Sequence, residues 1–396
     1  MKRKSLAALA ALAMLCLTVQ PAAANHDPKN SAFLEAIPAS HSLYAEEVSV
    51  SAHAAAVIDV QTGRVLYEKN GDEKMLIASL TKIITAIVAI ESGVDLNSTV
   101  TVSSRASGKE GSSIYLKVGE KQKLIDLLYA VMLRSGNDAA TAVAEHVGKT
   151  EQGFVELMNQ KVAELGLTQT HFANPHGLDA QEHYSSAHDM AVLTAYALRN
   201  PVFAEIVKTK VKSIPMPGEA WDRKMYNKNK MLTRYDGADG VKTGYTKAAG
   251  RCLASSATKD GRQIAVLTLD ASSDWDDHAR LLNYGFEKYK FMPVVKEHDV
   301  LQTVPVEDGM KQEVDVVVGH EFNFPLREEE QEKLTRKVEL EDSLDAPIAA
   351  GQKVGEMKFY FEERLVGEVP ILAGHDVQEK SFWEKVKGLF TSMISR

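Results

Sequence analysis

A short polar motif at the start of an apolar segment is the strongest constraint on the fold of this chain. Ser79 and Lys82 are three residues apart, and a mostly apolar run follows over residues 83–90. The run predicts a buried helix, on which positions i and i+3 share one face, so the Ser79 hydroxyl and the Lys82 amine are expected to touch. An amine whose pKa is lowered by burial or by a neighbouring cation can accept the hydroxyl proton. Alone, such a pattern is more often a helix cap followed by a surface lysine, because it is short and common.

The length and charge of the chain limit how many domains it can form and which partners it can bind. Its 396 residues allow two or three domains and a sizeable core. The formal net charge is -8, and no basic stripe interrupts the sequence. These features give no indication of a nucleic-acid partner.

The first residues have the pattern of an export signal. Positive residues at 2–4 precede an apolar stretch at 6–19, and three alanines at 22–24 offer a cleavage site. The sequence therefore predicts a signal peptide over 1–24, an export step, and a polar linker over 25–47. Cys16 lies in the apolar stretch, so Cys252 would be the one cysteine left after cleavage. We expect no intrachain disulfide and a buried, unreactive Cys252.

Residues 48–291 are predicted to form one domain in which a sheet carries packed helices. Two strands over 55–60 and 64–69 make a hairpin that leads into the Ser79 helix. Helices over 124–133 and 139–147 place Ser135 and Asn137 on the turn between them. Further strands over 252–257 and 263–269 precede a closing helix at 278–289, and Lys242 falls on a neighbouring strand.

The C-terminal third has a different pattern. Alternating runs at 300–304, 312–318, 334–340 and 355–361 predict a small β domain over 292–375. Over 376–396 the apolar side chains share one helical face: Phe382, Trp383, Val386, Leu389, Phe390, Met393 and Ile394. Lysines and an arginine lie off that face, which is typical of a helix in a membrane interface; packing on the β domain is the alternative.

Four histidines cluster in the sequence but match no compact metal-ligand motif. They are His171, His176, His183 and His188. Since their spacings fit no known zinc pattern and no cysteine pair accompanies them, we expect neither a metal nor a cofactor.

Three motifs occur in a fixed order: Ser79-x-x-Lys82, Ser135-x-Asn137 and Lys242-Thr243-Gly244. This set resembles that of penicillin-binding proteins and class A β-lactamases, although Gly136 stands where those proteins carry Asp. Segments 174–178 and 185–190 add to the likeness. The chain resembles the D-alanyl-D-alanine carboxypeptidases of the low-molecular-mass penicillin-binding protein family. The resemblance implies an α+β fold: a penicilloyl-serine transferase/β-lactamase-like catalytic domain with helices on both sides of an antiparallel sheet, then a small all-β domain and a terminal amphipathic helix.

The resemblance also implies the reaction. A serine-type carboxypeptidase of this family removes the terminal D-alanine from peptidoglycan stem pentapeptides and so remodels the cell wall. Ser79 would be the nucleophile of an acyl-enzyme and Lys82 the general base. Ser135 would relay a proton to the leaving amine, and Asn137 would hold Lys82 and the substrate amide. The backbone N–H groups of Ser79 and Tyr245 would bind the oxyanion.

Substrate binding and location follow from the same resemblance. Lys242 would supply positive charge, Thr243 would bind the terminal carboxylate, and Gly244 would let the substrate backbone approach. An arginine common in relatives is missing at 272–277, and Arg251 and Arg280 are not assigned in its place. The implied partners are the stem peptide, β-lactam inhibitors and, through the terminal helix, the outer face of the cytoplasmic membrane.

Two alternatives stay open at this point. A β-lactamase of the same fold would need a Glu-x-x-Leu-Asn loop after the second motif, whereas this chain has Asn174-Pro175-His176-Gly177-Leu178 there. A catalytically silent penicillin sensor or wall-binding protein would keep the fold, but here all catalytic positions are filled.

Overall fold

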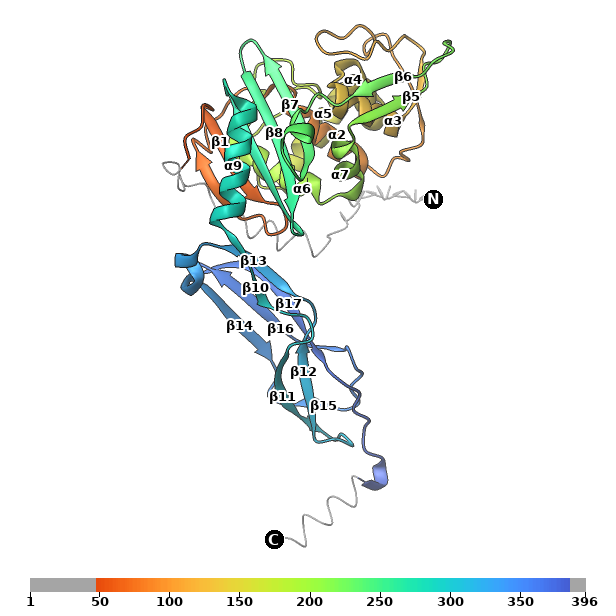
Figure 1. Cartoon of the computed structure of the whole chain (residues 1–396). Helices are drawn as coiled ribbons and strands as arrows, with labels where there is room; N and C mark the ends of the chain where they lie inside the picture. Colours follow the sequence, from red (N-terminus) through yellow and green to blue (C-terminus); the bar gives the residue numbers. More distant parts are fainter. Residues whose placement is uncertain (1–47, 385–396) are drawn as a thin grey trace, which may run out of the picture.

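A computed structural model describes residues 48–384 of the chain (Figure 1). The described chain forms two bodies: an α/β body from β1 to α9, and an all-β body from β10 to β17 that extends away from it. The predicted signal peptide and the whole of the predicted linker lie outside the described residues, as do residues 385–396 of the predicted terminal helix.

The α/β body consists of runs of strands separated by runs of helices. Its helical elements are η1 (Ala78–Thr81), α2 (Lys82–Glu91), α3 (Leu124–Tyr129), η2 (Ala130–Arg134), α4 (Asn137–Gly148), α5 (Glu151–Glu164), α6 (Ala187–Leu198), α7 (Pro201–Lys208), α8 (Met231–Arg234) and α9 (Asp274–Lys288). Its strands are β1 (Ala54–Asp59), β2 (Val65–Lys69), β3 (Thr99–Thr101), β4 (Lys121–Lys123), β5 (Val211–Ile214), β6 (Arg223–Tyr226), β7 (Ala238–Thr246), β8 (Gly250–Lys259) and β9 (Arg262–Leu269).

A five-stranded antiparallel sheet divides this body into two layers. Its order is β2-β1-β9-β8-β7, so β7 is an edge strand. Side chains of a strand alternate between faces, and in β1 Ala56 and Ile58 enter the core that contains α2 and α6, while Val57 enters the core that contains α9. The expected sheet with helices on both sides is confirmed.

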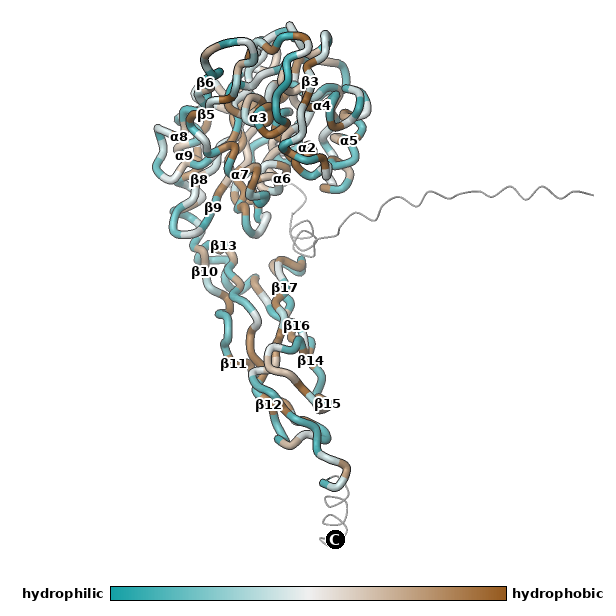
Figure 2. The backbone as a smooth tube through the Cα atoms, turned by 90° about the vertical axis from the view of Figure 1, so that its right-hand side faces the viewer, coloured by the Kyte–Doolittle hydropathy of each residue, from teal (hydrophilic) through white to brown (hydrophobic). Residues whose placement is uncertain are grey.

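The helix after Ser79 is buried almost throughout, as its apolar run predicts. Residues 82–89 of α2 are all buried, and Figure 2 colours this helix toward the hydrophobic end of the scale. Two details differ from the prediction. Ser79 lies on the 3-10 turn η1 rather than on the α-helix, and Ala78 before it has a left-handed backbone with φ 47°. Asn137 is the first residue of α4, so of the predicted pair only Ser135 lies between the helices.

The β body is built from a large and a small sheet. Its elements are β10 (Lys290–Val295), β11 (Val300–Glu307), β12 (Glu313–Val318), β13 (Phe322–Leu326), η3 (Glu328–Lys333), β14 (Leu334–Leu340), β15 (Leu344–Asp345), β16 (Lys353–Phe361) and β17 (Arg364–Ala373). The six-stranded sheet has the order β14-β16-β17-β12-β11-β15, and β10 pairs with β13. All four expected strand regions are present. The β structure begins at 290, two residues before the expected boundary.

One arginine joins the two bodies. Arg64, in the turn between β1 and β2, donates to the carbonyl of Pro325 and forms a 2.6 Å ion pair with Glu330 of η3. Three rings lie within 5.3 Å of its guanidinium carbon: Tyr289, Phe324 and Phe361. The side chains of Arg64 and Glu330 are 10% and 4% exposed, so the pair is shielded from water.

Three further observations concern the described residues alone. Cys252 is buried, as expected, and burial raises the pKa of its thiol to about 12. Within residues 48–384, no group of three or more His, Cys, Asp or Glu side chains is arranged to hold a metal ion. No helix in the same range has the length and apolarity required to cross a bilayer.

Candidate active site

The side chain of Lys82 is the centre of the site. It is fully buried at the start of α2. Its Nζ lies 3.1 Å from Ser79 Oγ and 2.7 Å from Asn137 Oδ1, and it also donates to the backbone carbonyl of His176. The structure thus brings together the first two motifs and a loop carbonyl around one amine. The contact between Ser79 and Lys82 that their spacing predicts is present, although a 3-10 turn rather than an α-helix provides it.

The orientation of the Asn137 amide is fixed from both ends. Its Oδ1 accepts from Lys82, and its Nδ2 donates to the carbonyl of Glu110 over 2.6 Å. The Asn137 backbone N–H donates to the carbonyl of Ser112 over 2.7 Å. The loop around 110–112, which the sequence analysis did not select, therefore forms one wall of the site.

Burial and nearby cations lower the pKa of Lys82 well below its ordinary value. Desolvation is the largest cause, because a charged ammonium is unfavourable in a water-free interior. The positive charges of Lys242 and Lys228 lower the pKa further, and the carboxylate of Asp138 acts in the opposite direction. A lysine in this environment holds its proton less tightly than an exposed lysine, which favours the neutral amine.

The third motif lies on β7, against the turn that carries Ser79. A β-carbon added to Gly244 would lie 3.2 Å from the Ser79 backbone nitrogen, so the strand passes very close to that turn. Lys242, on the same strand, is 1% exposed and donates to the Thr243 carbonyl over 2.7 Å. Burial, and then the charge of Lys228, lowers the pKa of Lys242 to about 7.

Ser135 also has a left-handed backbone, with φ 62° between η2 and α4. The side chain is 4% exposed. Tyr245, near the C-terminal end of β7, has a side chain that is 67% exposed.

Two groups near Lys82 could not be predicted from the three motifs. Lys228, between β6 and α8, donates to Ser112 Oγ over 3.0 Å and acts electrostatically on both buried lysines. The carbonyl of His176 is a backbone group and has no signature of its own, although its loop was selected as family-like. The unassigned arginines are engaged elsewhere: Arg251 pairs with Asp274 and Arg280 with Asp277.

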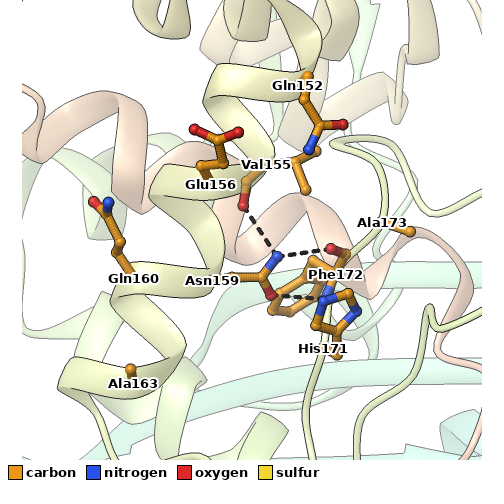
Figure 3. A pocket seen from close by; sticks show the side chains of 9 residues that line it. All are labelled: Gln152, Val155, Glu156, Asn159, Gln160, Ala163, His171, Phe172 and Ala173. Carbon is orange, nitrogen blue, oxygen red and sulfur yellow. Dashed lines mark hydrogen bonds between the residues drawn. The ribbon is translucent and has the colours of Figure 1, made fainter.

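A separate hollow lies over α5 and the segment 171–173 (Figure 3). Its volume is about 650 Å³, and its lining includes Gln152, Glu156 and Asn159 of α5. None of the motif residues lines it, so this hollow is distinct from the site around Lys82.

The fold and the site define a class. A helix-flanked antiparallel sheet, with a serine hydroxyl beside a buried lysine of lowered pKa and an edge strand passing the same turn, is typical of the penicillin-binding protein fold.

Comparisons with known proteins specify the family. Residues 41–273 match the D-alanyl-D-alanine carboxypeptidase family, and residues 289–379 match the C-terminal domain of penicillin-binding protein 5. The chain therefore belongs to the D-alanyl-D-alanine carboxypeptidase family.

Individual relatives are similar to this chain over most of its length. D-alanyl-D-alanine carboxypeptidase DacF of Bacillus subtilis is 31% identical, with 85% of this chain and 88% of that protein covered. DacC of Escherichia coli is 33% identical over 86% and 88% of the two chains. Crystal structures of penicillin-binding protein 5 from Haemophilus influenzae superpose with a TM-score of 0.66 at 29% identity, over 84% of this chain and 99% of that one.

Proposed function

We propose that this chain is a serine D-Ala-D-Ala carboxypeptidase whose nucleophile is Ser79 and whose general base is Lys82. One observation carries the proposal. Lys82 Nζ has three hydrogen-bond partners. Two of them can only accept a hydrogen bond: Asn137 Oδ1 and the His176 carbonyl oxygen. A neutral amine has two protons, and these two acceptors use both. As an ammonium ion, Lys82 donates its third proton to Ser79 Oγ over 3.1 Å; as the neutral amine, it has its lone pair free to accept the Ser79 hydroxyl proton.

The chemistry follows from this arrangement. Lys82 takes the hydroxyl proton while Ser79 Oγ attacks the carbonyl between the two terminal D-alanines. The backbone N–H groups of Ser79 and Tyr245 stabilise the oxyanion. Ser135 passes a proton to the departing D-alanine amine, and Asn137 holds Lys82 and the substrate amide. Water then hydrolyses the acyl-enzyme, and a β-lactam acylates the same oxygen but leaves slowly.

Recognition of the substrate rests on β7. An edge strand presents a row of backbone donors and acceptors that an extended peptide can pair with. Gly244 has no side chain, and this lets that peptide approach the strand closely. The Thr243 hydroxyl and the Lys242 ammonium bind the terminal carboxylate. The positive charge of Lys228, which is exposed to solvent beside Ser112, favours an anionic group in the same place.

We propose that residues 48–291 are the catalytic domain, that 292–375 form a separate β domain, and that 376–396 associate with the membrane after export directed by 1–24. The exposure of two aromatic side chains just after the β body supports membrane association: Phe382 is 71% and Trp383 77% exposed. Aromatic rings of this kind are favoured at lipid interfaces. A chain truncated after Gln378 is expected to leave the membrane fraction; if it still sediments with vesicles, this part of the proposal is wrong.

Labelling and turnover test the catalytic proposal. Fluorescent penicillin is expected to label the wild-type chain and not Ser79→Ala, and only the wild type is expected to release D-alanine from diacetyl-Lys-D-Ala-D-Ala. Ser104→Ala, at an exposed serine away from the site, is the matched control and is expected to behave as wild type. Labelling without peptide turnover would favour a penicillin sensor, and labelling of Ser79→Ala would exclude Ser79 as the nucleophile.

A further inference from the structure

The residue before Ser79 has a backbone conformation that needs support. Ala78 has φ 47°, in the left-handed region that is unfavourable for a residue with a β-carbon. The peptide between Ala78 and Ser79 is a rigid trans plane, in which the carbonyl and the N–H point in opposite directions. Whatever fixes the direction of the Ala78 carbonyl therefore also fixes the Ser79 N–H, which is the proposed oxyanion donor.

Two side chains form a directed chain of hydrogen bonds to that carbonyl. Thr81 Oγ1 donates to Ala78 O over 2.8 Å, and His183 Nε2 lies 2.8 Å from the same hydroxyl oxygen. The backbone N–H of Ala173 donates to His183 Nδ1 over 3.0 Å, so Nδ1 carries no proton. The neutral imidazole therefore has its proton on Nε2 and donates it to Thr81. This leaves the Thr81 hydroxyl proton for the Ala78 carbonyl.

The charge state of the ring suits this role. His183 is 2% exposed and Thr81 is fully buried. Burial is the largest cause that lowers the pKa of His183 to about 4, with smaller contributions from the charges of His176, His171 and Lys82. The ring is thus neutral at physiological pH. A second proton would have to sit on Nδ1, where it would oppose the N–H of Ala173.

The segment at 172–173, whose Ala173 N–H sets the tautomer of His183, is hydrogen-bonded to Asn159 of α5. Asn159 accepts from the Phe172 backbone N–H over 3.0 Å and donates to the Phe172 carbonyl over 2.8 Å (Figure 3). The Phe172 ring meets the His183 ring edge-on, with centroids 5.7 Å apart. These contacts fix both the Ala173 N–H and the plane of the imidazole, so the chain of hydrogen bonds starts from a rigid point.

We infer that His183 and Thr81 are positioning residues that orient the Ser79 N–H toward the oxyanion. Neither side chain touches the substrate; each acts through the Ala78 carbonyl. This inference rests on the proposed role of Ser79. An oxyanion forms only in the transition state, so a misdirected donor lowers kcat and leaves KM nearly unchanged.

The test compares Thr81→Val, which keeps the shape and removes the hydroxyl, with Thr81→Ser, which keeps the hydroxyl. In Thr81→Val, kcat for diacetyl-Lys-D-Ala-D-Ala is expected to fall about tenfold to hundredfold, less than the ~10²–10³ for deleting a donor outright. A peptide boronic acid, whose boronate oxygen takes the oxyanion position, is expected to lose affinity by the same factor. Thr81→Ser is expected to recover most of both.

A second pair of variants addresses the histidine. His183→Gln retains a donor in the place of Nε2–H and is expected to stay closer to wild type than His183→Ala. The exposed His53→Gln is the control. If Thr81→Val keeps the wild-type kcat, or loses rate through KM without weakening the boronic acid, the inference is wrong. If penicillin does not label the wild-type Ser79 at all, the proposed function itself fails, which is a separate result.

Discussion

The side-chain oxygen of Asn137 lies 2.7 Å from Lys82 Nζ, although 55 positions separate the two residues in the sequence. Because this oxygen can only accept, it takes one proton of the Lys82 amine and helps to direct the lone pair toward Ser79. It also leaves Lys82 beside a neutral group rather than a carboxylate. A charged partner at this distance would stabilise the ammonium form and remove the base.

Asn137→Asp tests this relationship. The new carboxylate is expected to raise the pKa of Lys82, so kcat/KM for diacetyl-Lys-D-Ala-D-Ala at pH 7 falls about 10²-fold, and the rising limb of the pH–rate profile moves to higher pH. Asn97→Asp adds the same charge at an exposed position and is the control. A profile that keeps its shape and position in Asn137→Asp would contradict the assignment of Lys82 as the base.

The pH dependence of the wild type follows from the two buried lysines. Lys82 is active as the neutral amine, so activity is expected to rise with pH through its lowered pKa. Lys242 binds the carboxylate as the ammonium ion, and its pKa of about 7 means that this charge is lost as the pH rises further. A bell-shaped kcat/KM profile is therefore expected for the free enzyme, and a flat profile between pH 6 and 10 would contradict it.

Gly177→Ala should damage the turn before Ser79. A β-carbon there would lie 2.0 Å from the Ala78 carbonyl oxygen, and φ at this glycine is +85°. We expect the free energy of unfolding to fall by about 1–3 kcal/mol and acylation by penicillin to slow, because the carbonyl must move. Gly261→Ala separates the effect of the left-handed backbone from the effect of the close contact. Gly261 has φ +78°, but no atom lies within 4 Å of the position of an added β-carbon. Equal effects of the two changes on acylation would show that the close contact is unimportant.

Arg64→Met should weaken the junction between the two bodies. The change removes the guanidinium from the buried Glu330 carboxylate, and loss of one member of a buried ion pair costs about 3–5 kcal/mol. Denaturant unfolding of the whole protein measures this loss of free energy of unfolding. Lys208→Met, which removes an exposed pair with Glu205, is the control and should leave the midpoint nearly unchanged. Equal midpoints for the two variants would mean that Arg64 does not stabilise the junction.

Local patterns predicted much of the fold. The alternation around the turn at 61–63 predicted β1 and β2, and the apolar run after Lys82 predicted α2. Eight strands of the described chain were not predicted: β3, β4, β5, β6, β10, β13, β15 and β17. Two of these have a clear physical reason. β13 contains Pro325, and β17 contains Gly367 and Pro370, residues that interrupt a strand pattern and weaken its signal.

The site could be predicted only where a motif carries it. The meeting of Ser79 with Lys82 follows from their spacing, whereas Lys82 meets the His176 carbonyl from 94 positions away, and Thr81 meets His183 from 102 positions away. Backbone carbonyls have no residue type, and such long-range pairs are set by packing of the whole α/β body. The left-handed turn at Ala78 was equally unpredictable, because alanine has no preference for that conformation.

The burial of Cys252 has a practical consequence. Its side chain is 1% exposed, and the raised pKa of its thiol keeps it protonated, so alkylating dyes should not react with it in the native state. Once residues 1–24 are absent, no other native cysteine competes for a label. A cysteine introduced on the surface of each body would thus accept a fluorophore selectively, and energy transfer between the two dyes would report how rigidly Arg64 fixes their separation in solution.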